Sequence, residues 1–363
     1  MKPKLRFSNF INDYEIKDVS DITSNISSGK ISKQLEDGEY NVYGSMGIIG
    51  KSNFYDYAGE KVLVARVGAN AGSVNKINEK CCISDNTLVL EPKDILNDYL
   101  YYALSHYNPK KLIFGSGQPL VTGGQLKKIK LGIPSKEEQL KVSNFLSLLD
   151  KKIELQSKKI EDLKLFKKGL LNVISKEITE SKTIKEICEY KNGNSYEEYV
   201  CDEGKYNLIS LNSVDINGNL KNDMKKIKLS NPDTLIKNDI VMVLSDVAHG
   251  DFLGVSALID EDNKYVLNQR MGLLRIMDNS IPQFIVEMIN NEQRKFKILG
   301  QGSSQLNLSK DDILNQKIKY PCIISQKKYA TIFNNINTGL KLNKEKLIKL
   351  QELKKGLMQN MFV

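Results

Sequence analysis

Apolar residues recur along two stretches of the chain at alternating spacings of four and three positions. The first series runs from Val142 to Ile174 and the second from Tyr329 to Met361. This spacing is typical of a helix that buries one stripe against a second helix, as in a coiled coil. We therefore expect two long helices of about 38 residues, roughly 57 Å each, that pair with each other in an antiparallel coiled coil.

Both series place polar residues at the same two steps, Gln156 with Asn343 and Lys167 with Lys354. Polar residues in such a seam lower stability but fix register and partner, which we favour for Gln156 and Asn343. For the lysines, stems that lie along the surface with the ammonium group in water are an equal alternative. The expected helix interface comprises Leu149, Ile153, Gln156, Ile160, Leu163, Ile336, Leu340, Asn343, Leu347 and Leu350.

A segment of the sequence is repeated at a constant offset of 187 positions. The stretch GSGQPLVTGGQLKKIKLGIPSKEEQ, which starts at Gly115, matches GSSQLNLSKDDILNQKIKYPCIISQ from Gly302, and KKGLL at 167–171 matches KKGLM at 354–358. The chain thus uses a half of roughly 180 residues twice. Gly169 and Gly356 are duplicated within these helices, where each costs about 1 kcal/mol, so we expect close packing there.

Each half begins with a region of short strand patterns, and the two regions differ in sequence. Strands are expected near residues 39–44, 61–68, 86–92, 206–212, 239–247, 255–259 and 271–277, and short helices at 94–106 and 281–297. These patterns predict an α+β fold with twisted, mainly antiparallel sheets. The expected division is a first globular domain at 1–135, a long helix at 136–182, a second globular domain at 183–322 and a second long helix at 323–363.

The chain is basic, with 53 Lys and Arg against 44 Asp and Glu. Such a balance favours a nucleic-acid partner, although a lysine-rich composition alone also gives a basic chain. No apolar run approaches the ~18 residues of a membrane span, and no signal core precedes the first strand. The five cysteines form no C-x-x-C pair, so we expect reduced thiols, no zinc and a cytoplasmic protein.

Catalytic motifs are missing from the sequence, which contains two histidines. We find no cofactor glycine loop after a strand, no H-E-x-x-H and no G-x-S-x-G. The stretch YGSMGIIGKS at 43–52 ends like a phosphate-binding loop, but the first glycine is displaced and a strand pattern, not a helix, follows Ser52. Two interpretations remain for it: a loop that faces DNA, or a tight hairpin with an incidental lysine.

The repeated motif resembles the specificity subunit of type I restriction–modification systems. The resemblance rests on G-S-x-Q, a basic strand that ends in Pro134, the Glu138–Gln139 pair and a long helix that closes in K-K-G-L-L. PKLRFSNF at 3–10, VLVARVGANAGSV at 62–74 and LNQRMGLLRI at 267–276 resemble the family's target-recognition domains. In the second copy Ser325 replaces Glu138, which leaves the start of that helix less certain.

The resemblance implies a non-catalytic chain in which each globular domain reads one half of a bipartite, asymmetric DNA site. The paired helices would then act as a ruler for the unread gap, and their roughly 57 Å equals the length of about 16–17 base pairs of duplex. The helix interface from Leu149 to Leu350 would also dock two methyltransferase subunits, and restriction subunits would complete the enzyme. S-adenosylmethionine, ATP and Mg²⁺ would bind those partners and not this chain.

Candidate DNA contacts are polar residues in the recognition-domain motifs. Arginine suits guanine, and Gln or Asn suits adenine, at major-groove edges. The set comprises Tyr43, Lys51, Ser52, Arg66, Asn70 and Gln118 in the first half, and Ser245, His249, Gln269, Arg270 and Gln305 in the second. Two other functions remain open: an independent two-headed DNA-binding regulator, which would bind DNA tightly without a methyltransferase, and a coiled-coil adaptor, whose DNA affinity would show no steep salt dependence.

Overall fold

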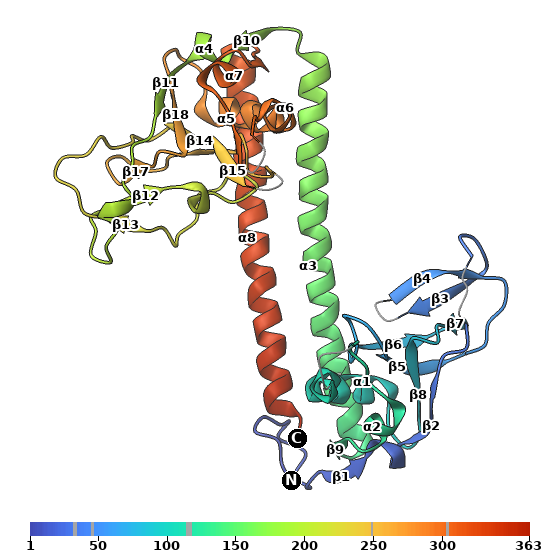
Figure 1. Cartoon of the computed structure of the whole chain (residues 1–363). Coiled ribbons are helices and arrows are strands. Elements are labelled where there is room, and N and C mark those ends of the chain that lie inside the picture. The colour runs from blue at the N-terminus through green and yellow to red at the C-terminus, as the bar shows by residue number, and fades with distance from the viewer. Residues whose placement is uncertain (32–34, 45–46, 114–117, 248–249, 303–304) are drawn as a thin grey trace. The chain divides into compact units, whose positions relative to one another are not determined.

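The computed structural model describes residues 1–31, 35–44, 47–113, 118–247, 250–302 and 305–363. The chain divides into two compact units, whose elements are labelled in Figure 1. Unit 1 consists of Met1–Lys158 and Glu345–Val363, and unit 2 of Lys159–Lys344. Each unit therefore contains a part of each long helix.

The two long helices are α3 (Lys136–Glu177) and α8 (Ile323–Met361), of 42 and 39 residues. All twenty seam positions, from Val142 to Ile174 and their repeats, are buried or half-buried, which confirms the expected stripe. In unit 2, Lys167 of α3 bonds to Asn337 of α8, whereas Ile174 shares a core with Ala330. Residue numbers thus rise on one helix as they fall on the other, so the pairing is antiparallel as expected.

Unit 1 combines three small sheets with two short helices. The strand orders are β2-β8-β5-β6, β4-β3-β7 and β1-β9, and all pairs are antiparallel except β3–β7. Its elements are β1 (Glu15–Asp18), β2 (Thr23–Ser28), β3 (Tyr40–Gly44), β4 (Gly47–Ser52), β5 (Glu60–Ala65), β6 (Val74–Asn78), β7 (Cys81–Ile83), β8 (Thr87–Pro92), α1 (Asn97–Tyr107), α2 (Gly123–Lys127) and β9 (Lys130–Ile133).

Unit 2 repeats this topology although its sequence differs. The orders β11-β18-β14-β16, β13-β12-β17 and β10-β20 match those of unit 1 strand by strand, and β15 pairs with β19 in addition. Its elements are β10 (Ser181–Thr183), α4 (Ile184–Ile187), β11 (Cys188–Asn192), β12 (Tyr206–Ile209), β13 (Lys226–Ile227), β14 (Ile240–Val243), β15 (Ser245–Val247), β16 (Ser256–Leu258), β17 (Tyr265–Leu267), β18 (Met271–Ile276), α5 (Pro282–Asn291), α6 (Gln293–Leu299), β19 (Gln305–Asn307), α7 (Lys310–Leu314) and β20 (Lys317–Lys319).

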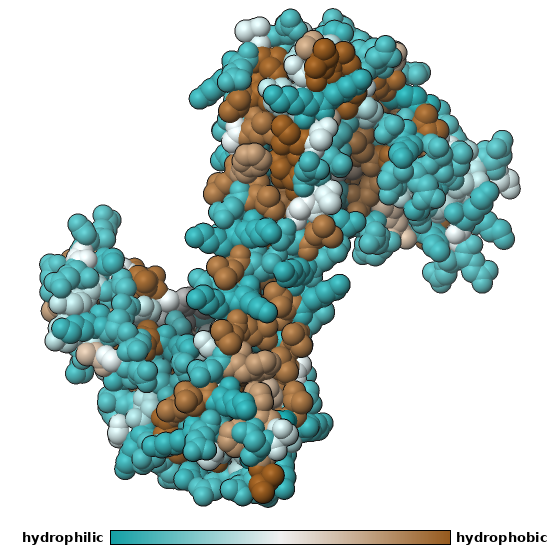
Figure 2. Space-filling model, turned by 180° about the vertical axis from the view of Figure 1, so that it is seen from behind, coloured by the Kyte–Doolittle hydropathy of each residue, from teal (hydrophilic) through white to brown (hydrophobic). Residues whose placement is uncertain are grey.

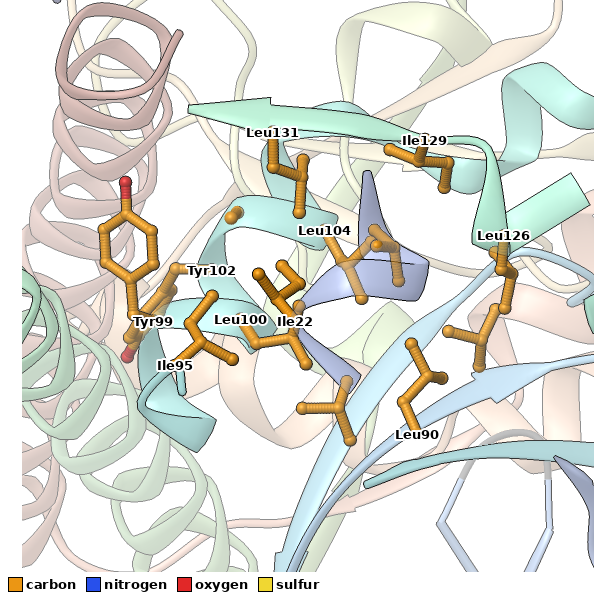
Figure 3. Packing of buried hydrophobic residues seen from close by; sticks show 14 of the residues in the cluster. Ile22, Leu90, Ile95, Tyr99, Leu100, Tyr102, Leu104, Leu126, Ile129 and Leu131 are labelled. Atoms are coloured by element: carbon orange, nitrogen blue, oxygen red, sulfur yellow. The ribbon is translucent and has the colours of Figure 1, made fainter. Parts of the chain in front are cut away.

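The core of unit 1 forms where α1 packs on the sheet. Figure 3 shows Leu100 and Leu104 of α1 near Ile22, with Leu90 of β8 and Leu126 closing the cluster. These side chains are almost completely buried, and each such burial contributes about 1.5–3 kcal/mol. The core therefore attaches the short helix firmly to the sheet. In unit 2 the single helix expected at 281–297 is instead two helices, α5 and α6, which meet at Glu292.

The repeated glutamine of the exit motif links each long helix to the short helix beside it. Gln139 accepts the Leu96 N–H (2.9 Å) and donates to the Pro134 carbonyl (3.0 Å). Gln326 makes the same two contacts with Ile281 and the carbonyl before the second helix, at 3.1 and 2.9 Å. Leu96 and Ile281 precede α1 and α5, where helix N–H groups lack internal partners. The duplicated glutamine is thus a structural contact.

The neighbouring glutamate has a partner in unit 1 alone. Glu138 is buried and receives two bonds from the Arg6 guanidinium, at 2.8 and 2.7 Å, and one from the Tyr14 hydroxyl at 3.1 Å. Burial and Glu138 together raise the pKa of Tyr14, so it remains a donor. Ser325 takes the place of Glu138 in unit 2, yet α8 still begins at Ile323. The carboxylate therefore anchors the N-terminal segment and is not required to start the helix.

In unit 1, Lys354 joins both long helices to α1. Its ammonium group pairs with Asp150 of α3 and lies 5.6 Å from the Tyr102 ring centre. The Tyr102 hydroxyl donates to the same carboxylate at 2.7 Å. The lysine is half-buried among these groups, so the contact with a carboxylate explains its place in a mostly apolar stripe.

In unit 2, Lys167 makes the equivalent contact, but the carboxylate lies on a different element. Asn337 replaces the aspartate on the long helix, and Glu287 of α5 replaces the tyrosine on the short helix. Lys167 bonds to Glu287 (2.8 Å) and to Asn337 (2.9 Å), and Asn337 also donates to Glu287 (2.7 Å). We name each of these three-residue groups the lysine clamp. The two lysines bind partners and do not simply extend into water.

The duplicated glycines do not mark close packing, and that expectation is wrong. A Cβ atom added at Gly169 or Gly356 would meet no described atom within 4 Å. Both positions lie away from the seam, so the helices leave open space beside them.

We expect K167M to lower the free energy of unfolding by about 2–4 kcal/mol, because Glu287 would remain buried without its cation. Adding E287L should recover most of that loss, since the stranded charge is then removed. The exposed neighbour provides a control: K168M should change stability by less than about 0.5 kcal/mol. Urea unfolding followed by circular dichroism measures all three, and equal effects of K167M and K168M would contradict the role of the clamp.

Candidate nucleic-acid interface

Residues 43–44 and 47–52 belong to the strands of a hairpin and not to a phosphate-binding loop. Strands β3 and β4 pair antiparallel, with a register shift between Val42 and Tyr43. A phosphate loop would need a helix after Ser52, where this hairpin strand ends. Ser45 and Met46 lie outside the described residues. The described part of this stretch thus lies on the two strands of a hairpin, and whether it contacts DNA stays a prediction.

A row of polar side chains lies along this hairpin. Lys51 donates to Asn41 (2.8 Å), Asn41 donates to Glu79 (3.1 Å), and the Tyr43 hydroxyl also bonds to Glu79. Burial and the bond to Glu79 raise the pKa of Tyr43 to about 12, so its phenol stays protonated at neutral pH. Ser52 is buried, and its hydroxyl accepts the Phe54 N–H. Lys51 is thus better placed than Ser52 to reach a phosphate.

Arg66 and Gln118 are brought close together by the backbone. Arg66 follows β5, and its carbonyl accepts the Val121 N–H at 2.8 Å. Gln118 lies three residues earlier on that second segment and is exposed. Asn70 belongs to the turn after Arg66, where Gly68 has a φ of +83° that favours glycine. Three of the six candidates in the first half therefore share one edge of unit 1.

Four of the five candidates in the second half line one open pocket of about 380 Å³. These are Ser245, Gln269, Arg270 and Gln305, and the remaining wall is Leu244, Asn307 and Leu308. Ser245 donates to Asn307 (2.7 Å) and accepts from the Gln305 amide. His249 lies outside the described residues. Sequence reasoning missed Asn307, because its counterpart in the repeat is Leu120 and no motif marks it.

The chemistry of this pocket suits base edges more than catalysis. The described residues that line it include no carboxylate, and Gln269 and Arg270 are exposed. No group of His, Cys, Asp and Glu among the described residues could hold a metal ion. Guanidinium and amide groups are the side chains that pair with guanine and adenine in the major groove.

The long helices also carry apolar residues on their outer surface. Leu155 and its repeat Leu342 are 57 % and 59 % exposed, and Phe166 and its repeat Leu353 are 59 % and 53 % exposed. Figure 2 shows apolar side chains along these helices with hydrophilic ones between them. The seam residues predicted as an interface, such as Leu149 and Ile160, are buried within the chain. The outer residues are therefore the ones available to another protein.

No helix in the described part of the chain has the length and apolar character that crossing a bilayer requires.

Two proteins of known kind show what this chain is similar to. The chain is 26% identical over 332 residues to the type I restriction enzyme MjaVIII specificity subunit of Methanocaldococcus jannaschii, which covers 82% of this chain and 77% of the relative. It is 27% identical over 121 residues to the EcoprrI specificity subunit of Escherichia coli, across 33% of this chain and 30% of that protein.

Solved structures agree at the level of the fold. The S subunit of a type I restriction–modification system from M. genitalium matches with a TM-score of 0.75 at 18% identity, over 100% of this chain and 99% of that one. A structure of a type I restriction–modification assembly matches with a TM-score of 0.56 at 11% identity, over 97% and 98%.

The model of the type I restriction modification DNA specificity domain matches twice, at residues 11–165 and 176–352, so it spans nearly the whole chain and reproduces its repeat. The chain therefore belongs to the family of type I restriction–modification specificity subunits, the non-catalytic subunits through which these enzymes recognise DNA.

Proposed function

We propose that this chain reads a bipartite, asymmetric duplex site, one half with each unit, and carries two methyltransferase subunits on its long helices. One observation supports this most directly. The two units share strand order, glutamine contact and lysine clamp, yet their exposed polar residues differ. A repeated scaffold with different surface side chains is what reading two different half-sites requires.

Binding would depend strongly on salt, because lysines predominate among the 53 basic residues. Phosphate contacts by lysine release counterions, and they position the protein without reading sequence. Base contacts would then come from the few exposed arginine, glutamine and asparagine groups. Methyl transfer with S-adenosylmethionine and ATP-driven cleavage would belong to the partner subunits.

The adenine-methylation map of cells that express this chain with its methyltransferase subunit tests the proposal. We expect a bipartite motif with a fixed gap that is absent from cells with the methyltransferase alone. If the two proteins co-purify and no motif appears, recognition by this chain is refuted. If they do not co-purify but the chain alone binds DNA tightly, the independent regulator replaces this proposal.

The gap between half-sites should follow helix length. Removing 152–158 from α3 together with 346–352 from α8 keeps the seam in phase and shortens both helices by about 10 Å. We expect the gap to shrink by about three base pairs, and matched seven-residue insertions should lengthen it by the same amount. Methylation mapping reads both, and an unchanged gap in either variant would refute the role of the helices as a spacer.

The outer leucines should hold the methyltransferase subunits. L155E and L342E are each expected to weaken the attachment of one subunit by more than about 1 kcal/mol, and the double variant should lose both. I298E, at an exposed apolar residue of α6, is the matched control. Native mass spectrometry gives the stoichiometry, and a complex of unaltered composition in the double variant would exclude this surface.

A further inference from the structure

A backbone junction in unit 1 joins three separate segments of chain. Arg66, directly after β5, donates its N–H to the Asn86 carbonyl (2.9 Å), and Asn86 directly precedes β8. The Arg66 carbonyl accepts the Val121 N–H (2.8 Å), and Val67 pairs with Leu120 as an antiparallel bridge. Two strand ends of the main sheet thus meet the segment that leads into the exit motif.

Unit 2 contains the same junction, bond for bond. Leu244, directly after β14, donates its N–H to the Arg270 carbonyl (3.0 Å), and Arg270 directly precedes β18. The Leu244 carbonyl accepts the Leu308 N–H (2.9 Å), and Ser245 pairs with Asn307 in antiparallel register. The pocket of about 380 Å³ in unit 2 opens at this junction.

On the strand side of the junction these bonds match positions that the 187-residue repeat does not align, because the strands before the exit motif differ in length, whereas the pairs within the exit motif keep that offset. The corresponding pairs are Arg66 and Leu244, Val67 and Ser245, Asp85 and Gln269, Asn86 and Arg270, Gln118 and Gln305, and Leu120 and Asn307. Each junction holds one arginine, but on different segments. In unit 1 the arginine follows β5, and in unit 2 it precedes β18. The backbone is shared, and the side chains it displays are rearranged.

Arginine is scarce in this chain, with five among 53 basic residues. Arg6 and Arg275 make two-bond contacts with the buried carboxylates of Glu138 and Asp239. Neither Arg66 nor Arg270 forms an ion pair or a side-chain hydrogen bond with another described residue. In a chain that otherwise uses lysine, an arginine at each junction whose planar fork has no partner among the described residues indicates an external partner.

We propose that this junction is the base-reading site of each unit, and that Arg66 and Arg270 each contact a guanine through its major-groove edge. The inference rests on the proposed function and specifies its reading residues. Guanine offers the two acceptors that match the guanidinium fork. The glutamines of the junctions, Gln118 in unit 1 and Gln269 and Gln305 in unit 2, suit adenine. Because the arginines stand on different segments, the two units read their guanines at different positions, and the complete site is asymmetric.

The experiment uses this chain in complex with its methyltransferase subunit and duplex libraries randomised in one half-site at a time. R270K and R270A should each reduce the preference for guanine at one position of one half-site about 5- to 150-fold, with the other half-site unchanged. R66K and R66A should do the same in the other half-site. R294A, at an exposed arginine of α6, should preserve both preferences.

The lysine variants separate base reading from charge. Lysine keeps the cation that a phosphate contact needs but lacks the planar fork, so loss of guanine preference with retained salt dependence supports the inference. Full guanine preference in R270A, or a loss in R270A that is uniform across all sequences, overturns it. If the unaltered complex methylates no bipartite site at all, the proposed function has failed and not the assignment of the arginines. Thermal unfolding of each variant identifies any that fail to fold. In that case the variant Q305A is tested on duplexes randomised at one position of the half-site, and it probes the same junction.

Discussion

The apolar stripe on the two long helices is the constraint on which the remaining structure depends. Each stripe leaves water by packing against the other helix and against the core of its unit, and the antiparallel pairing gives both units a segment of each helix. The core of unit 1 therefore contains Met361 from the far end of the chain beside Val142 and Leu146. No half of the sequence can complete its own core, so the repeated halves must fold as partners.

Periodic features were predictable from the sequence, and contacts between distant side chains were not. The stripe from Val142 to Ile174, the expected strands and the repeat each reflect a local pattern that recurs, and the structure confirms the fold they imply. Tyr102 and Glu287 gave no such signal, because their partners in the lysine clamps lie far away in sequence. Tyr102 bonds to Asp150, 48 positions on, and Glu287 to Asn337, 50 positions on. The two residues are also not separated by the 187-residue offset of the repeat. The common strand order was equally hidden, because burial preserves the apolar character of a strand and not its sequence.

The residues of the candidate DNA-binding surface were likewise predictable from the sequence only in part. Motif matching selected Ser245, Gln269, Arg270 and Gln305, and the fold brings them to one pocket. It could not select Asn86 or Asn307, whose relevance arises from backbone bonds between segments far apart in the chain. It also selected Ser52, which the turn buries, since spacing alone does not tell an exposed hydroxyl from one that stabilises a bend.

The two lysine clamps differ in where their negative charge resides. In unit 1 the acid belongs to the long helix, and in unit 2 it belongs to the globular domain. Recombination that moved the first domain into the second place would bring a tyrosine to Lys167 and Asn337 and leave that lysine without an acid. The reverse exchange would crowd Glu287 against Asp150 around a single ammonium group. Domains of this chain thus keep a balanced lysine clamp in the other place only when a residue of the long helix changes with them, and this limits how its two domains can be exchanged.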